Sequence, residues 1–257
     1  MKITDSVVFV TGGASGLGAA VVRRCVASGA KGVVIFDVSA DKAAALADEL
    51  GATALATSGD ITDSAQITAA IDAAKATFGR VDVLVGCAGI PWAERTVSRD
   101  GAAATLMSFT KLIGVNLVGM FDAASQCAAA MSANEPREDG ERGVIIMTAS
   151  IAAFDGQVGQ VAYSASKGGI VGMTLPMARD LGPVGIRVVT VAPGLVDTPI
   201  YDFAPPELKE GLAKQPVFPR RLGTPAEFAH LVEHIVENPY LNGEVIRIDG
   251  ALRMPPK

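Results

Sequence analysis

Short apolar runs alternate along this chain with segments in which apolar residues recur every three or four positions. A run rich in Val and Ile predicts a strand that is buried on both faces, whereas the wider spacing predicts a helix with one buried stripe. The predicted strands lie at residues 6–12, 32–37, 52–60, 81–89, 143–150, 186–194 and 243–250. The predicted helices lie at residues 15–28, 41–50, 63–79, 114–131, 163–181 and 224–237.

Strict alternation of strands and helices predicts an α/β fold, with right-handed crossovers and a doubly wound parallel sheet. The chain shows no internal repeat, low-complexity tract or boundary, so its 257 residues predict a single domain, 1–257. Two segments, 91–107 and 198–218, are longer than ordinary connections. Because long loops in compact α/β domains are usually functional, we expect the segment at about 198–218 to cover the substrate.

The composition narrows the possible partners. The formal charge, 22 − 27 = −5, lacks the basic excess typical of nucleic-acid surfaces. No apolar stretch free of charge is long enough to span a bilayer, and the opening segment "MKITDS" has no leader character, so we expect a soluble, cytoplasmic protein without a membrane partner. The three cysteines are odd in number and widely spaced, which indicates reduced thiols and neither disulfides nor a metal site.

A glycine-rich turn lies between the first predicted strand and the first predicted helix. In "TGGASGLG", Gly12, Gly16 and Gly18 would let the backbone approach a pyrophosphate at a helix N-terminus. Such a loop alone is a weak signal, but Asp37 ends the second strand, where dinucleotide folds place an acid on the adenosine ribose. A carboxylate there would repel a ribose 2′-phosphate, so we predict NAD over NADP.

The candidate chemistry lies at the fifth strand and the helix that follows it. Ser150 ends the strand, at the edge where ligands of open α/β sheets bind. Tyr163 and Lys167 are one helical turn apart, with small residues between them that leave room for a flat cofactor. A nearby ammonium lowers the pKa of a phenol, which suits the pair to proton transfer. By itself, such a pair is usually only a surface helix pair.

Together, T-G-x-x-x-G-x-G, the downstream serine and Y-x-x-x-K resemble the short-chain dehydrogenases/reductases over nearly the whole chain. This resemblance implies a single-domain Rossmann fold with a seven-stranded parallel sheet and helices on both faces. It implies that Tyr163 is the general acid/base, that Lys167 assists it, that Ser150 binds the substrate oxygen, and that Asn116 holds a water in a proton relay. Gln157 would join Ser150 and Tyr163 in binding substrate. The implied NAD site comprises Gly12, Ser15, Gly16, Leu17, Gly18, Asp37, Asp60, Ile61, Cys87, Ala88, Gly89, Tyr163, Lys167, Pro193, Val196 and Thr198.

Some of these residues have simpler interpretations. Asp60 could be a turn residue, Ile61 and Cys87 core residues, and Asn116 a bridge between helices. Arg220 and Arg221, after the long segment, could contact coenzyme A phosphates or be solvated surface charges.

Residues 143–181 and 218–254 most resemble the family members that oxidise short-chain 3-hydroxyacyl-CoA thioesters. That branch implies reversible oxidation of a secondary alcohol, on an acyl-CoA or a hydrophobic alcohol such as a steroid, and a homotetramer built from helices 114–131 and 163–181 and the last strand. The alternatives are a broad alcohol or steroid dehydrogenase, a 3-oxoacyl reductase, and, in another class, a non-catalytic NAD-binding regulator or an RNA-processing partner. Regulators typically lose the Tyr or the Lys, and the negative charge disfavours direct RNA binding.

Overall fold

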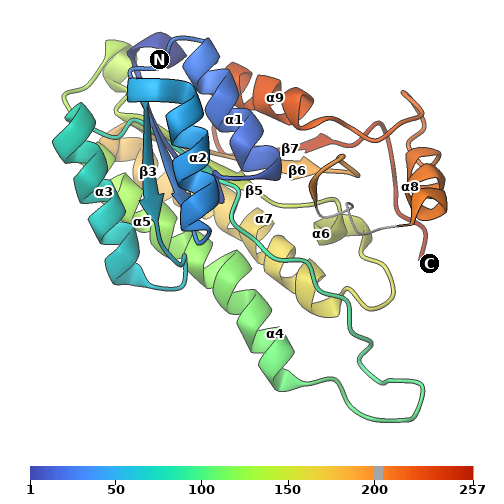
Figure 1. Ribbon diagram of the computed structural model, residues 1–257. Coiled ribbons are helices and arrows are strands. Elements are labelled where there is room, and N and C mark those ends of the chain that lie inside the picture. Colours follow the sequence, from blue (N-terminus) through green and yellow to red (C-terminus); the bar gives the residue numbers. More distant parts are fainter. Residues whose placement is uncertain (200–204, 257) are drawn as a thin grey trace.

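Seven parallel strands form one sheet in the order β3-β2-β1-β4-β5-β6-β7 (Figure 1). The structure is a computed structural model, and it describes residues 1–199 and 205–256. The strands are β1 Val7–Thr11, β2 Gly32–Asp37, β3 Ala54–Ser58, β4 Val83–Gly86, β5 Gly143–Thr148, β6 Ile186–Pro193 and β7 Val245–Ile248. The predicted single-domain fold with a seven-stranded parallel sheet is thus confirmed.

Helices cover both faces of the sheet (Figure 1). They are α1 Gly16–Ala27, α2 Ala40–Leu50, α3 Ser64–Phe78, α4 Leu106–Ile113, α5 Gly119–Ser132, α6 Ala152–Asp155, α7 Val161–Leu181, α8 Pro206–Ala213 and α9 Pro225–Glu237. Short 3₁₀ turns lie at Ile3–Asp5, Gly51–Thr53, Glu138–Gly140 and Gly182–Val184.

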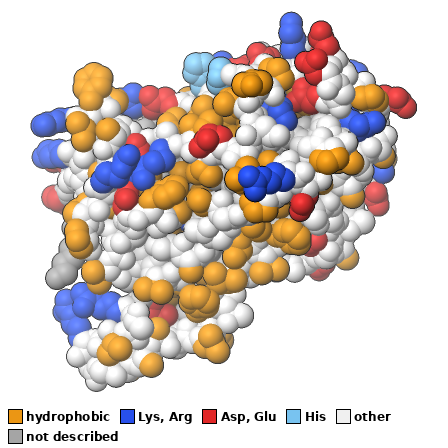
Figure 2. All heavy atoms as spheres, turned by 180° about the vertical axis from the view of Figure 1, so that it is seen from behind, with side chains coloured by type: hydrophobic (Ala, Val, Ile, Leu, Met, Phe, Trp, Pro, Cys, Tyr) orange, Lys and Arg blue, Asp and Glu red, His pale blue; other side chains and the backbone are white. Residues whose placement is uncertain are grey.

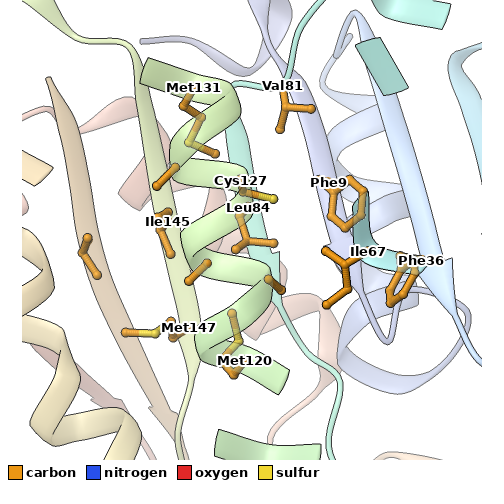
Figure 3. Close-up of a cluster of buried hydrophobic side chains, with 14 of the residues drawn as sticks. Phe9, Phe36, Ile67, Val81, Leu84, Met120, Cys127, Met131, Ile145 and Met147 are labelled. Atoms are coloured by element: carbon orange, nitrogen blue, oxygen red, sulfur yellow. The ribbon is translucent and has the colours of Figure 1, made fainter. Parts of the chain in front are cut away.

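The two faces of the sheet carry separate cores. Phe9 points to the face covered by α3, α5 and α7, while its neighbours Val8 and Val10 point to the face covered by α1, α2 and α9. In Figure 3, side chains of α5 such as Met120 and Met131 lie against the strands. Because both faces are buried, the strands read as continuous apolar runs, which is why the sequence predicts them.

Each end of α3, within the predicted helix 63–79, is fixed by a local signal. The Asp63 carboxylate accepts hydrogen bonds from the backbone N–H groups of Ala65 and Gln66, and Gly79 ends the helix with a φ of 85°. Such a cap contributes about 1 kcal/mol. A complete capping box, formed by Thr224 and Glu227, starts α9.

The predicted helix 114–131 is longer and less regular than expected. It begins at Leu106 as α4, passes through a π-helical turn at Gly114–Val118 and continues as α5. Among the described residues, Leu106–Ser132 is the one helix long and apolar enough to cross a membrane by length and composition alone. Core helices pass the same test, and 44% of its most apolar window is buried in the protein.

Neither long segment is featureless. The first carries an antiparallel bridge between Val97 and Ala103, and the backbone N–H of Glu94 donates to the carbonyl of Gly159 at 2.8 Å. The expected substrate segment 198–218 contains α8, which the pattern did not predict. Residues 200–204 of this segment lie outside the described residues.

Candidate active site

A cleft lies at the carboxyl ends of β4, β5 and β6. It gathers several predicted site residues from distant parts of the chain: Leu17, Cys87, Gly89, Ser150, Tyr163, Lys167, Pro193, Val196 and Thr198. Ile90, Pro91, Thr148, Ala149 and Gly194 complete its lining, and the sequence did not predict them. The strand order reverses between β1 and β4, and such a switch point is where open α/β sheets bind their ligands.

The glycine loop has the close backbone packing that a dinucleotide cradle needs. Gly12 has a φ of +63°, and a Cβ there would lie 2.7 Å from the backbone nitrogen of Ala88, while a Cβ on Gly18 would overlap the carbonyl of Gly12. Gly16 has a φ of +51° and opens α1, with Ser15 as N-cap residue. This bare helix N-terminus fits a pyrophosphate, because its free N–H groups and dipole favour negative charge.

Asp37 lies beside this loop at the end of β2. Its carboxylate accepts hydrogen bonds from the backbone N–H groups of Ala14, at 3.0 Å, and Ser39, at 2.9 Å. These bonds hold the carboxylate at the edge of the loop. The next residue, Val38, is 74% exposed, so this edge is open to solvent. The structure therefore places a fixed negative charge where the sequence predicts the ribose acid.

Asp60 and Ile61 follow β3 and have local structural roles. The Asp60 carboxylate accepts bonds from the backbone N–H and the hydroxyl of Thr62, at 2.9 and 2.8 Å, which hold its pKa below the usual range. Ile61 is buried in the core. The simpler interpretations of both residues hold, and their contacts with a cofactor stay a prediction.

Lys167 is a buried cation without a matching carboxylate. Only 5% of its surface is exposed, and its Nζ donates to the carbonyl of Thr148 at 2.8 Å. No Asp or Glu in the described part of the chain forms a salt bridge with it, and burial lowers its pKa to about 8. An ammonium has three donors, so this geometry leaves donors for the hydroxyls of a ligand.

Tyr163 differs from the expectation in its acidity. Its pKa is raised, because burial disfavours the charged phenolate more than the hydrogen bond from Ser150 favours it. The Nζ of Lys167 lies 5.9 Å from the centroid of the Tyr163 ring and bonds to Thr148 instead of the phenol. The raised pKa is opposite in direction to the lowering that the Lys167 ammonium alone would cause.

Asn116 lies on the π-helical turn and is fully buried. Its Oδ1 accepts from the N–H of Ile90 at 2.8 Å, and its Nδ2 donates to the carbonyl of Ile90 at 3.0 Å and to the Ser166 hydroxyl at 3.3 Å. Ser166 in turn donates to the carbonyl of Tyr163 at 2.8 Å. The Asn116 side chain thus bridges the segment after β4 to α7, and its water-holding role stays a prediction.

Two predicted residues have partners away from the cleft lining. Gln157, expected to bind substrate, donates through Nε2 to the carbonyl of Pro255 at 3.0 Å. Arg221, considered for coenzyme A, pairs with both carboxylate oxygens of Glu227, at 2.7 and 2.9 Å. The sequence pattern indicates neither pairing. Pro255 is distant from Gln157 in the chain, and Glu227 was assigned only to the predicted helix 224–237.

Cys87 lines the cleft, and its sulfur lies 3.8 Å from the Thr148 hydroxyl. Burial raises its pKa to about 12, so the group is a neutral thiol and not a nucleophilic thiolate. The sequence reasoning missed Thr148 and Ser166. No signal marks Thr148, but Ser166 stands inside the Tyr163–Lys167 turn and is the one buried serine there.

Comparison with known proteins agrees with this geometry. The profile of the short chain dehydrogenase family matches residues 6–208. The human 3-hydroxyacyl-CoA dehydrogenase type-2 is 53% identical over 256 residues, which cover 99% of this chain and 98% of that protein. A crystal structure of 3-hydroxyacyl-CoA dehydrogenase type-2 from Mycobacterium avium is 47% identical, with a TM-score of 0.94 over 99% of this chain and 98% of its own.

The chain therefore belongs to the short-chain dehydrogenase family, and it is an oxidoreductase with a nicotinamide cofactor and a small-molecule substrate. A further similar structure is the 3-ketoacyl-(acyl-carrier-protein) reductase from Brucella melitensis complexed with NADH. It is 27% identical, with a TM-score of 0.87 over 98% of this chain and 100% of its own.

Proposed function

We propose that this enzyme oxidises the secondary alcohol of short-chain 3-hydroxyacyl-CoA thioesters with NAD⁺, and reduces 3-oxoacyl-CoA in the reverse direction. One observation carries the proposal: Ser150, Tyr163 and Lys167 line a single cleft that continues to the glycine loop. The names of the human and mycobacterial relatives support the substrate class.

A nicotinamide cofactor held at the glycine loop would supply the hydride acceptor for oxidation of the carbinol carbon and the hydride donor for the reverse reduction. Ser150 holds the substrate oxygen by its hydroxyl, which the N–H of Ala152 positions at 3.1 Å. The Tyr163 oxygen takes the proton of the alcohol in oxidation and returns it to the carbonyl in reduction. The Lys167 ammonium, 5.9 Å from the centroid of the Tyr163 ring, offsets part of the cost of forming the buried phenolate.

The raised pKa of Tyr163 gives the two directions different pH dependences. Burial favours the neutral phenol, which is the form that donates a proton during reduction. Oxidation needs the phenolate, whose population grows as the pH rises. We therefore expect the oxidation rate to increase from neutral to alkaline pH, and the reduction rate to be higher at neutral pH.

NAD is the cofactor that this site favours. The Asp37 carboxylate is fixed beside the glycine loop by Ala14 and Ser39, and the loop "TGGASG" has no Arg or Lys to receive a 2′-phosphate. A fixed negative charge at that position repels the extra phosphate of NADP. The ratio of kcat/KM for NAD⁺ and NADP⁺ tests this choice, and a preference for NADP⁺ would refute it.

The segment 198–218 is our candidate cover for the substrate. Thr198 lines the cleft, and Lys209 of α8 pairs at 2.7 Å with Asp197 beside it. The backbone of Val217 and Phe218 is bonded to the turn after β7. Limited proteolysis should cut this segment more slowly when NADH and acetoacetyl-CoA are both bound, and identical cleavage would count against a covering role.

A substrate panel tests the proposed activity. Purified protein with NAD⁺ should reduce the cofactor, measured at its absorbance band, with short-chain 3-hydroxyacyl-CoA at a higher kcat/KM than with hydroxysteroids or simple secondary alcohols. A higher kcat/KM on steroids would favour the broad dehydrogenase. No turnover of any alcohol, with NADH binding retained, would favour the non-catalytic regulator.

We also propose a homotetramer. Exposed apolar side chains gather along the α4–α5 helix, where Leu106, Met107, Val118 and Phe121 are 52–79% exposed, and others lie on the face drawn in Figure 2. Such a surface on a helix that is only partly buried fits an interface between copies. Light scattering that gives the mass of a monomer would refute this assembly.

We further propose the cytoplasm as its compartment. All three cysteines, Cys25, Cys87 and Cys127, are free thiols, as is usual in a reducing compartment. Cell fractionation with an antibody tests this proposal, and recovery in a membrane or secreted fraction would contradict it.

A further inference from the structure

Arg247, on β7, is the centre of a charge cluster that sequence reasoning did not single out. Its guanidinium donates to Asp155 Oδ2 at 2.6 Å and to Asp249 Oδ2 at 2.7 Å, so one cation joins the carboxylates of two separate elements. The same group donates to the carbonyl of Leu252 at 3.1 Å and lies 5.1 Å from the ring centroid of Phe154. Its side chain is 21% exposed, so these contacts are partly shielded from water.

The Asp155 contact ties Arg247 to α6, the short helix that follows the cleft residue Ser150. Asp155 ends α6, a four-residue helix that starts two residues after Ser150. The N–H of Ala152, the first residue of α6, donates to the Ser150 hydroxyl. A shift of α6 therefore moves the group that positions this hydroxyl. Among the described residues, Arg247 is the only cation that forms a salt bridge with Asp155.

The Asp249 contact ties Arg247 to the turn after β7. Asp249 packs directly behind the cleft, because a Cβ on the lining residue Gly194 would lie 2.8 Å from the Asp249 Cα. The next carbonyl, that of Gly250, accepts hydrogen bonds from the N–H groups of Val217 and Phe218, at 2.9 and 3.3 Å. The turn after β7 thus anchors the end of the segment proposed to cover the substrate.

The C-terminal segment also bonds to the residues just after α6. Its carbonyls at Pro255 and Pro256 accept from the Gln157 side chain and from the N–H of Val158, at 3.0 and 3.1 Å, just beyond α6. Figure 1 shows α6, α8 and the C-terminus on the same side of the molecule. Asp249 has a second partner in Arg253, at 3.1 Å, but that side chain is 60% exposed and does not reach α6 in any recorded contact.

We propose that Arg247 is a positioning residue for the acyl substrate: it fixes α6 and the anchor of segment 216–219 relative to each other. The proposal rests on the function proposed above, because it assigns this side of the cleft to the acyl-CoA. The cofactor loop lies at β1 and α1 and has no contact with the cluster among the described residues. Arg247→Met should therefore affect the acyl substrate more than NADH, whose predicted site includes Pro193 and Val196 on either side of Gly194.

The test compares Arg247→Met with Arg137→Met. Arg137 is a matched control, because its side chain is 20% exposed and pairs with a buried carboxylate, Asp82, at 3.0 Å at the opposite end of the strands. Because misplacing a reacting group by about 1 Å can cost up to about 10²-fold in rate, we expect Arg247→Met to raise the KM for acetoacetyl-CoA and to lower kcat/KM about tenfold or more. The Kd for NADH should change by a smaller factor. Asp155→Asn should shift the KM in the same direction, and Arg137→Met should lower the Tm without changing the KM.

An unchanged KM in Arg247→Met, or an equal rise in Arg137→Met, overturns the proposal. If Arg247→Met does not fold, Arg247→Lys decides by the same measurement, since a single ammonium reaches the two carboxylates less well than a planar guanidinium. If the wild type turns over no 3-oxoacyl-CoA, the proposed function fails by that result alone. Hydrogen exchange then decides on Arg247: the amides of Val158, Val217 and Phe218 should exchange faster in Arg247→Met than in Arg137→Met, and equal rates would overturn its role.

Discussion

The buried charges at the two ends of the sheet differ in how completely they are paired. At the amino ends of β5 and β6, Glu141 and Arg187 form a salt bridge at 2.7 Å, and the guanidinium also donates to the carbonyls of Ile235, Val236 and Leu241. At the carboxyl ends, Lys167 is as buried as Arg187, yet its recorded partner in the described part of the chain is a single carbonyl, that of Thr148.

This difference separates structural charges from functional ones. A buried charge is tolerated when it is paired and its donors are bonded, and the amino edge meets both conditions. At the carboxyl edge the charge has no carboxylate partner among the described residues, and its pKa is lowered to about 8, so we propose that its remaining donors and its field act on a ligand. Strongly shifted groups in a cleft are a common mark of active sites. Substitutions at the two edges should therefore differ in what they damage.

The largest effect is expected from Tyr163→Phe at the carboxyl edge. Removing a positioned proton carrier should lower kcat on the order of 10²–10⁴-fold. NADH affinity, measured by fluorescence titration, and the Tm should stay near wild type, because the ring that packs in the cleft remains. Turnover at the wild-type rate would exclude Tyr163 as the acid/base.

Glu141→Gln at the amino edge should lower the stability of the fold and leave turnover unchanged. It leaves Arg187, only 6% exposed, without a carboxylate, and breaking a buried ion pair costs about 3–5 kcal/mol of stability. Urea unfolding measures this loss, while kcat per folded molecule should not change. Glu49→Gln is the matched control: its pair with Arg23 is about half exposed and screened by solvent, so the loss should be much smaller. Equal losses in the two variants would contradict the contrast between buried and surface pairs.

The smallest change in stability is expected from Lys167→Met, and it has the opposite sign. At pH 7 the wild type keeps a buried ammonium whose pKa is about 8, below the ordinary lysine value of 10.5 that we take for the unfolded chain. Removing this charge should stabilise the fold by on the order of 1 kcal/mol, since the unbonded carbonyl of Thr148 offsets part of the gain. Turnover should be lost.

The sign of the pH dependence follows from the lowered pKa. Between about pH 8 and 10.5 the unfolded chain binds more protons at Lys167 than the folded protein does, so this residue makes the wild type more stable as the pH rises through that window. The advantage of Lys167→Met in unfolding free energy should therefore shrink above pH 8. A constant or growing advantage between pH 7 and 10 would show that this burial cost is absent.

Much of the fold could be predicted because its signals are local. Val7–Thr11 and the strands beside it read as strands from their continuous apolar runs, and Gly12, Asp37, Ser150 and Tyr163 could be placed at strand ends or at the start of a helix. The helix α8 was missed because its eight residues are few and mostly polar, and α6 is too short to show a period. The π-helical turn at Gly114–Val118 has no local signal in the sequence.

The site was predictable in its residue types but not in its contacts. Spacing places Lys167 one turn after Tyr163, yet the pKa of the phenol is raised, because burial disfavours the phenolate. The ammonium bonds to a carbonyl nineteen residues earlier in the chain. Gln157 could be expected near the substrate, yet its amide bonds to Pro255. In both cases the partner comes from a distant segment.

Periodicity, glycine placement and motif spacing are thus sufficient to predict the fold class, the cofactor loop and the Ser–Tyr–Lys set, because each depends on residues close together in the chain. Burial and distant partners decide the acidity of Tyr163, the uncompensated charge of Lys167 and the linking of α6 to the turn after β7 by Arg247. These partners are up to 92 residues apart. Desolvation and long-range pairing exist only once the sheet has brought those segments together, so no local pattern records them.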